Sequence, residues 1–173
     1  MISDMNRFTR VTIAAGATSA ALSMLVGFAP TASAATGPRM INANGYCLGS
    51  QNGANKTNAI QWYCNKNPDQ VWGLHSAGSD SRGTYYRVTN DNGQCLGISG
   101  TSKASGAAAT VWDCNGHNDQ LWYWQNGSGA GWHKLINRNS GMCLGTSGSA
   151  VGAKAIQWSC NGNPDQEWAP LNG

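Results

Sequence analysis

Three tryptophans and three aspartates recur in this sequence at positions where they could form ligand-binding sites. Each tryptophan stands two residues before a cysteine, and we call these the Trp-x-Cys tryptophans: Trp62, Trp112 and Trp158. Each aspartate directly precedes a Gln-x-Trp element, and we call these the Asp-Gln aspartates: Asp69, Asp119 and Asp165. An asparagine directly follows each of the same cysteines: Asn65, Asn115 and Asn161. An aromatic wall with a few convergent polar groups is typical of small binding sites.

The sequence offers no comparable set of residues for catalysis. Its one glutamate, Glu167, is the variable residue of a Gln-x-Trp element, whereas a glycosidase needs two carboxylates that converge in one cleft. No Ser, Cys or His stands in a recognisable nucleophile context, and no glycine-rich loop joins a strand to a helix. We therefore expect neither enzymatic activity nor a cofactor.

The candidate site residues belong to a sequence unit that occurs three times. The unit opens with Cys-Leu-Gly, and its first cysteines are 48 residues apart: Cys47, Cys95 and Cys143. A period of this size indicates a repeated supersecondary unit that needs its neighbours to bury an apolar face. We place the three repeats at about residues 40–79, 80–127 and 128–173.

Each repeat holds two of the six cysteines. Six cysteines can pair in 15 ways, and the threefold repetition favours pairing within each repeat: Cys47–Cys64, Cys95–Cys114 and Cys143–Cys160. Each such bridge closes a short loop and would contribute about 3 kcal/mol in the chain-entropy model. The alternative is a zinc site, but no Cys-x-x-Cys pair occurs and the three histidines are not equivalent in the repeats. We expect no metal.

The first 34 residues are typical of a secretory signal peptide. Arg7 and Arg10 form a positive region, a largely apolar stretch covers residues 11–29, and Ala32-Ser33-Ala34 forms a cleavage site. The alternative is a membrane anchor, which the many small residues and the cleavage site argue against. We expect a secreted, extracellular domain at residues 35–173, in a compartment where disulfides persist.

The composition of the chain restricts its possible fold classes and binding partners. The formal net charge of +3 is too small and too evenly spread for a nucleic-acid or membrane surface. Abundant Gly and Asn favour turns over helices, and no segment shows a sustained helical period. Short strand-like segments recur four times in each repeat, which predicts a twelve-stranded all-β fold. Its threefold closure would hide the sheet edges.

The complete pattern resembles the ricin B-type lectin domain, a β-trefoil whose three repeats each end in Gln-x-Trp. The matching elements are Gln70-Val71-Trp72, Gln120-Leu121-Trp122 and Gln166-Glu167-Trp168, with the Cys-Leu and Cys-Asn elements before them. The resemblance covers essentially all of residues 35–173 and is closest in character to a secreted bacterial member. It implies carbohydrate binding, with the Trp-x-Cys tryptophans stacking on sugar and the nearby aspartates and asparagines reaching the same ligand.

Purely structural roles compete with this interpretation. We interpret the Gln-x-Trp tryptophans as core residues and their glutamines as scaffold residues. We also expect the leucines of Cys-Leu-Gly to lie in the core, together with Ile60, Val111 and Ile156. The Trp-x-Cys tryptophans could be core as well, since Trp62 stands two residues after Ile60 and would share its side of a strand. For the Asp-Gln aspartates we favour turn capping over sugar contact, because prolines mark a tight turn there.

The chain departs from the family pattern directly after Cys-Leu. Sugar-binding members usually carry an aspartate there, whereas this chain has the Cys-Leu-Gly glycines: Gly49, Gly97 and Gly145. Hydrogen bonds to a carboxylate contribute about 1.5–3 kcal/mol each, so this departure counts against sugar binding. Repeat two is the most polar candidate, because it adds Asp113 beside its tryptophan and His117 in the following turn.

Two functions therefore remain open. The first is a secreted, non-catalytic carbohydrate-binding protein, a monomer with three weak sites that bind polysaccharide or glycan by avidity. The second is a β-trefoil that has lost sugar binding and acts as a protein-interaction or inhibitor module. Exposure of the Trp-x-Cys tryptophans separates them, because buried rings would contradict the sugar-binding hypothesis.

Overall fold

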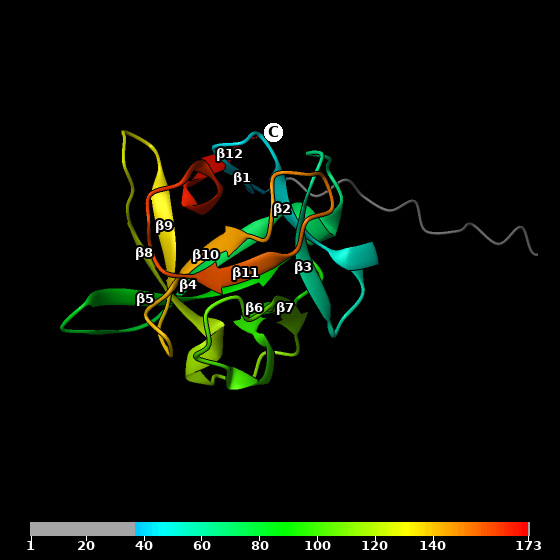
Figure 1. The fold of residues 1–173 in the computed structure, drawn as a ribbon. Helices are drawn as coiled ribbons and strands as arrows, with labels where there is room; N and C mark the ends of the chain where they lie inside the picture. The colour runs from blue at the N-terminus through cyan, green and yellow to red at the C-terminus, as the bar shows by residue number, and fades with distance from the viewer. Residues whose placement is uncertain (1–36, 173) are drawn as a thin grey trace, which may run out of the picture. The chain divides into compact units, whose positions relative to one another are not determined.

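The computed structural model describes residues 37–172, which form an all-β structure (Figure 1). Twelve strands join in one hydrogen-bonded sheet, and the helical segments of this range are five single 3₁₀ turns. The range holds no helix that is long and apolar enough to cross a membrane. The predicted signal peptide lies outside the described residues.

Each repeat supplies four strands. Repeat one has β1 (Arg39–Asn42), β2 (Cys47–Ser50), β3 (Thr57–Trp62) and β4 (Trp72–Asp80), with turns η1 (Gln51–Gly53) and η2 (Pro68–Gln70). Repeat two has β5 (Gly83–Asn90), β6 (Cys95–Ile98), β7 (Ala109–Trp112) and β8 (Leu121–Asn126), with η3 (Ser99–Thr101) and η4 (Asn118–Gln120). Repeat three has β9 (His133–Asn137), β10 (Cys143–Thr146), β11 (Ala155–Trp158) and β12 (Trp168–Leu171), with η5 (Pro164–Gln166).

The first and last strands of the repeats form a barrel-like ring. Antiparallel pairs link β1 to β12, β12 to β9, β9 to β8, β8 to β5 and β5 to β4. A bridge between Arg39 and Val71 and a 2.9 Å bond from the Trp72 N–H to the Pro38 carbonyl return the chain to β1. The first and last strands therefore lie side by side (Figure 1), and closure protects the sheet edges.

The two middle strands of each repeat form the hairpins that carry the candidate sites. These hairpins are β2–β3, β6–β7 and β10–β11. Neighbouring hairpins also contact each other: β3 pairs with β7, Ile60 bridges to Lys154, and Ala108 bridges to Ile156. A closed barrel with three mutually contacting hairpins is a β-trefoil, so the predicted fold class is confirmed.

The Gln-x-Trp tryptophans lie in the core, as predicted. None is more than 1% exposed, and the leucines of Cys-Leu-Gly are fully buried beside them. Each indole N–H donates a hydrogen bond of 2.8–3.0 Å to the leucine carbonyl of its own repeat: Trp72 to Leu48, Trp122 to Leu96, and Trp168 to Leu144. The large apolar ring is thereby buried while its polar N–H remains satisfied.

The core prediction fails at two positions of the hairpins. Val111 is fully buried, but Ile60 and Ile156 are only half-buried, and Gln61 and Gln157 point inward instead. The residue directly before each Trp-x-Cys tryptophan, not the residue two before it, faces the core. Alternation along the strand then turns the tryptophan outward.

The predicted disulfides are confirmed within each repeat. The bonds join Cys47 to Cys64, Cys95 to Cys114 and Cys143 to Cys160, with Cα–Cα distances of 5.0–5.1 Å. Each bond fastens the start of the first hairpin strand to the residues just after the second. The turn that follows each tryptophan is therefore held close to Cys-Leu-Gly.

Candidate functional site

The Trp-x-Cys tryptophans end β3, β7 and β11 and project from the surface. Their exposed fractions are 42% for Trp62, 42% for Trp112 and 46% for Trp158. Within residues 37–172, Tyr63 is the other large hydrophobic side chain with comparable exposure. The rings are not core, so the structure removes one of the two objections to a binding role.

Two of these tryptophans form walls of surface hollows. Trp62 lines a hollow of about 800 Å³ together with Asn65 and Asp69. In repeat two the equivalent trio lines a hollow of about 560 Å³: Trp112, Asn115 and Asp119. The candidate aromatic, amide and carboxylate groups therefore converge in both repeats. Repeat three carries the same trio at equivalent positions: Trp158, Asn161 and Asp165.

The Asp-Gln aspartates do not cap their own turns. The turns η2 and η5 have no side-chain cap. Instead, Asp69 Oδ2 accepts a 3.1 Å hydrogen bond from the Ser50 N–H, and Asp165 Oδ2 accepts a 2.9 Å bond from the Thr146 N–H. Each of these carboxylates thus crosses to the residue that follows Cys-Leu-Gly.

This crossing explains two of the three Cys-Leu-Gly glycines, Gly49 and Gly145. A Cβ placed on Gly49 would lie 2.9 Å from Asp69 Oδ2, and one on Gly145 would lie 2.5 Å from Asp165 Oδ2. A Cβ on Gly97 would lie 2.8 Å from the Gln120 side chain. No side chain fits at Gly49 or Gly145 while the aspartate stays in place, and none fits at Gly97 while the Gln120 side chain stays in place. The carboxylate of the Asp-Gln turn therefore lies beside the position where the family pattern has its aspartate.

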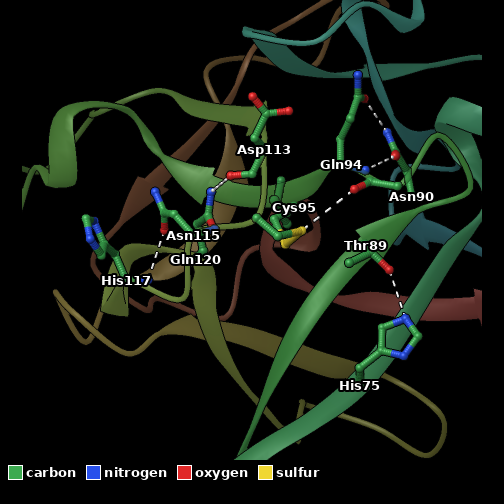
Figure 2. The surroundings of a disulfide bond; sticks show 12 residues. His75, Thr89, Asn90, Gln94, Cys95, Asp113, Asn115, His117 and Gln120 are labelled. Atoms are coloured by element: carbon green, nitrogen blue, oxygen red, sulfur yellow. Dashed lines mark hydrogen bonds between the residues drawn. A yellow bond between two sulfur atoms is a disulfide. The ribbon is translucent and has the colours of Figure 1, made fainter.

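The Gln-x-Trp glutamines hold the turn that links tryptophan to aspartate. Each Nε2 donates to the carbonyl of the residue after the tryptophan, and each Oε1 accepts from the backbone N–H of the asparagine after the cysteine. Figure 2 shows this arrangement for Gln120, with Asp113 on one side and Asn115 on the other. The predicted scaffold role explains how the polar groups keep their places.

The candidate asparagines also shape this turn. Their side-chain oxygens accept hydrogen bonds of 2.8–2.9 Å from backbone N–H groups two residues on: Asn65 from Asn67, Asn115 from His117, and Asn161 from Asn163. One oxygen lone pair of each asparagine is therefore used within the turn. The amide NH₂ is the group best placed to meet a ligand.

Repeat two differs from the others in its charged groups. Asp119 is 7% exposed, its Oδ1 has no hydrogen-bond partner among residues 37–172, and burial raises the pKa of its carboxyl. Asp113 does not line the hollow. Its carboxylate points away from the disulfide (Figure 2) and accepts a 2.7 Å bond from Asn55 Nδ2 of repeat one. The extra carboxylate thus joins two repeats.

The sequence analysis missed the residues that neighbouring repeats add to each site. Gly152 and Lys154 of repeat three line the hollow of Trp62, and Lys56 of repeat one lines the hollow of Trp112. The sequence did contain a signal for these residues, because Gly106 and Gly152 both stand six residues before a Trp-x-Cys tryptophan.

Within the described residues, no group of three or more His, Cys, Asp or Glu side chains could hold a metal ion.

The closed barrel, its three hairpins and their exposed tryptophans define a β-trefoil with three pseudo-equivalent surface sites. The family model of the ricin-type beta-trefoil lectin domain matches residues 36–168, and the chain belongs to this family. Family membership makes it a lectin-like, carbohydrate-binding protein. No curated protein matches the sequence significantly.

Solved structures agree with this assignment. The designed threefold-symmetric protein ThreeFoil has a TM-score of 0.72 at 25% identity, covering 79% of this chain and 98% of that protein. An exo-beta-1,3-galactanase from Clostridium thermocellum also reaches 0.72 at 25% identity, covering 83% of this chain and 31% of the enzyme. The hemolytic lectin CEL-III reaches 0.62 at 25% identity, covering 78% and 31%. The chain thus matches about a third of the length of the latter two proteins.

Proposed function

We propose that this chain is a secreted, non-catalytic lectin that binds polysaccharide or glycan weakly at several sites. The observation that carries the proposal is the convergence of an exposed indole, a carboxylate and an amide in one hollow, seen with Trp62, Asp69 and Asn65. The same arrangement recurs in repeat two. We also propose that the protein acts as a monomer whose partner is carbohydrate rather than nucleic acid or a membrane.

The chemistry of the hollow suits a pyranose ring. The C–H face of a sugar is apolar and carries weakly positive hydrogens, which pack on the negative face of an indole. Asp69 uses one oxygen to accept the Ser50 N–H, and its other oxygen can accept a sugar hydroxyl in a charge-assisted bond. Ser50 lines the same hollow, and its buried Oγ has no hydrogen-bond partner among residues 37–172.

The arrangement of the sites favours extended ligands. Each tryptophan lies on an open surface, so a single sugar would retain much of its contact with water and bind weakly. Three sites on one rigid domain raise the overall affinity for a polymer, because later binding events become intramolecular. The disulfides and the predicted signal peptide support an extracellular setting, in which such polymers are accessible.

The test is retention of the purified protein on insoluble polysaccharides, combined with a broad glycan array. Each change of a Trp-x-Cys tryptophan to alanine should lower affinity at its site by about threefold to tenfold, the range expected for a lost aromatic contact. A variant with Trp62→Ala, Trp112→Ala and Trp158→Ala should lose retention. The matched variant with phenylalanine at the three positions should keep part of it. Binding that survives the alanine changes would refute the site assignment.

A second candidate is protein binding, which one surface feature favours. Tyr63 is 63% exposed and lies beside Trp62 and Tyr46, with ring centroids 6.2 and 6.0 Å away. Such aromatic surfaces are common at protein interfaces. Silence on the glycan array, together with capture of a defined protein that added sugars do not release, would favour this candidate over the lectin function.

A further inference from the structure

Each Trp-x-Cys tryptophan is flanked by a loop from another repeat. Three residues hold the equivalent place in these loops, and we call them the covering residues: Lys56, Gly106 and Gly152. All three have a left-handed backbone, with φ of +62°, +82° and +85°. Each donates its N–H to the carbonyl just before a neighbouring tryptophan, over 2.9, 2.8 and 2.8 Å: Lys56 to Val111, Gly106 to Gln157, and Gly152 to Gln61. The backbone geometry therefore follows the threefold pattern.

Two of the covering residues are glycines that touch the indole. A Cβ on Gly152 would lie 3.2 Å from Trp62 Cζ3, and a Cβ on Gly106 would lie 3.3 Å from Trp158 Cζ3. A larger residue at either place would extend its side chain over the ring. With glycine there, the rings of repeats one and three are left free of any side chain from these two positions.

Lys56 breaks this pattern in repeat two. Its backbone adopts a left-handed conformation that glycine tolerates and most other residues avoid. Its ammonium lies 4.9 Å from the centre of the Trp112 ring. Both residues line the same hollow, so the cation and the ring it contacts belong to the same candidate site.

A second contact holds the loop that carries Lys56. Asn55 donates to Asp113, so two consecutive loop residues engage the consecutive residues Trp112 and Asp113. The equivalents of Asp113 are Tyr63 and Ser159, which carry no carboxylate. The other two loops are anchored differently, because buried Gln61 and Gln157 donate to their carbonyls. Val111, in the matching position of repeat two, has no such group.

We propose that Lys56 is a specificity-determining residue for the site of repeat two, although it belongs to repeat one. This proposal rests on the proposed function. A neutral pyranose can stack on Trp62 or Trp158 without displacing a covering side chain, but on Trp112 it must first displace an ammonium for which it offers no charge in return. The three sites are therefore unequal, and the chain is divalent at sugar concentrations that fill only repeats one and three.

The experiment follows the indole N–H signals of the three tryptophans by NMR during titration with galactose, glucose and N-acetylglucosamine. In the unmodified protein, Trp112 should respond at higher sugar concentration than Trp62 and Trp158. Lys56→Gly suits the left-handed backbone and should lower the Trp112 midpoint by about twofold to fivefold, the factor that corresponds to an exposed cation–π contact. The midpoints at the other two tryptophans should not change.

Lys56→Asn is the second variant, because asparagine also tolerates a left-handed backbone, and it should act in the same direction. The reciprocal change, Gly152→Lys, should raise the Trp62 midpoint. Equal midpoints at all three tryptophans in the unmodified protein, or an unchanged Trp112 midpoint in both Lys56 variants, would overturn this proposal and leave the lectin function intact. Silence of all three indoles with every sugar, together with no retention on any polysaccharide and no signal on the glycan array, would overturn both.

Discussion

At the scale of single residues, the sites of repeats one and three each depend on an exchange of space between a glycine and an aspartate. The glycine after Cys-Leu leaves space that the carboxylate of the Asp-Gln turn fills, since a Cβ on Gly145 would lie 2.5 Å from Asp165 Oδ2. Glycine here serves close approach rather than an unusual backbone angle. The absence of an aspartate after Cys-Leu therefore does not mean that the site lacks a carboxylate.

This exchange predicts a specific loss of stability. Gly145→Ala places a methyl group against Asp165 and the Gln166 side chain, and it should lower the free energy of unfolding by about 1–3 kcal/mol through overpacking. Gly148→Ala is the matched control, since a Cβ there meets nothing within 4 Å. Denaturant unfolding with intact disulfides measures both changes. Equal stability of the two variants would contradict the exchange.

Asp119 predicts a dependence of stability on pH. Burial raises the pKa of its carboxyl above the ordinary value of 3.8, so the folded state binds a proton more readily than the unfolded state. Its contribution to stability is then greatest below pH 3.8 and falls as pH rises through the raised pKa. Asp119→Asn should therefore increase the stability of the protein more at neutral pH than at pH 3. Thermal unfolding at the two pH values tests this, and a stabilisation that is larger at pH 3 would refute it.

At the scale of elements, the strands β3, β7 and β11 present their tryptophans because the preceding residue is fixed inward. Gln61 is fully buried, and it donates to the carbonyls of Gly148 and Ala150 over 3.0 and 2.7 Å while accepting from Asn42 over 2.9 Å. The side chain therefore orients its own strand and the loop of another repeat together. The outward orientation of Trp62 depends on both this strand and this loop.

Gln61→Ala should destabilise the protein by about 2–4 kcal/mol, because the buried amide of Asn42 and the carbonyls of Gly148 and Ala150 lose their partner. Gln51→Ala changes an exposed glutamine and should have little effect. Equilibrium unfolding compares the two variants. A cost below 1 kcal/mol for Gln61→Ala would show that the loop is held by its other contacts.

The strands and their contacts differ in how well they can be predicted from the sequence. The repeated cysteines and Gln-x-Trp elements predict the strands and the disulfides, because these follow from local pattern and repetition, and the resemblance to the ricin B-type lectin domain implies the trefoil. The spacing of Ile60 and Trp62 misleads, because a buried glutamine takes the inward position and is satisfied by Asn42 and by carbonyls about 90 residues away. Contacts such as Lys56 with Trp112 depend on how the repeats close, which no single repeat encodes.

At the scale of the whole molecule, pseudo-threefold closure places three related sites on one rigid domain. The hairpins contact each other pairwise, so each site is completed by another repeat. The sites cannot reorient independently. A polymer that reaches two of them gains affinity without any new contact at either one.

Avidity predicts different losses for polymers and single sugars. Trp62→Ala removes one of the three sites and should reduce retention on insoluble polysaccharide by about tenfold or more, because ligands then lose simultaneous binding at Trp62 and Trp158, the two sites that Lys56 does not weaken. The midpoint for a single sugar at Trp158 should stay the same. Depletion assays measure the retention on polysaccharide, and NMR titrations measure the midpoint at Trp158. A change of both quantities by the same factor would argue against multivalent binding.

Sugar binding at these sites is tested most directly by a crystal structure with the glycan that the array identifies. We expect a pyranose ring packed on the face of Trp62 or Trp158, with a sugar hydroxyl within hydrogen-bond distance of Asp69 or Asp165. A glycan bound elsewhere on the domain, or packed on the tryptophan with no contact to the aspartate, would contradict it.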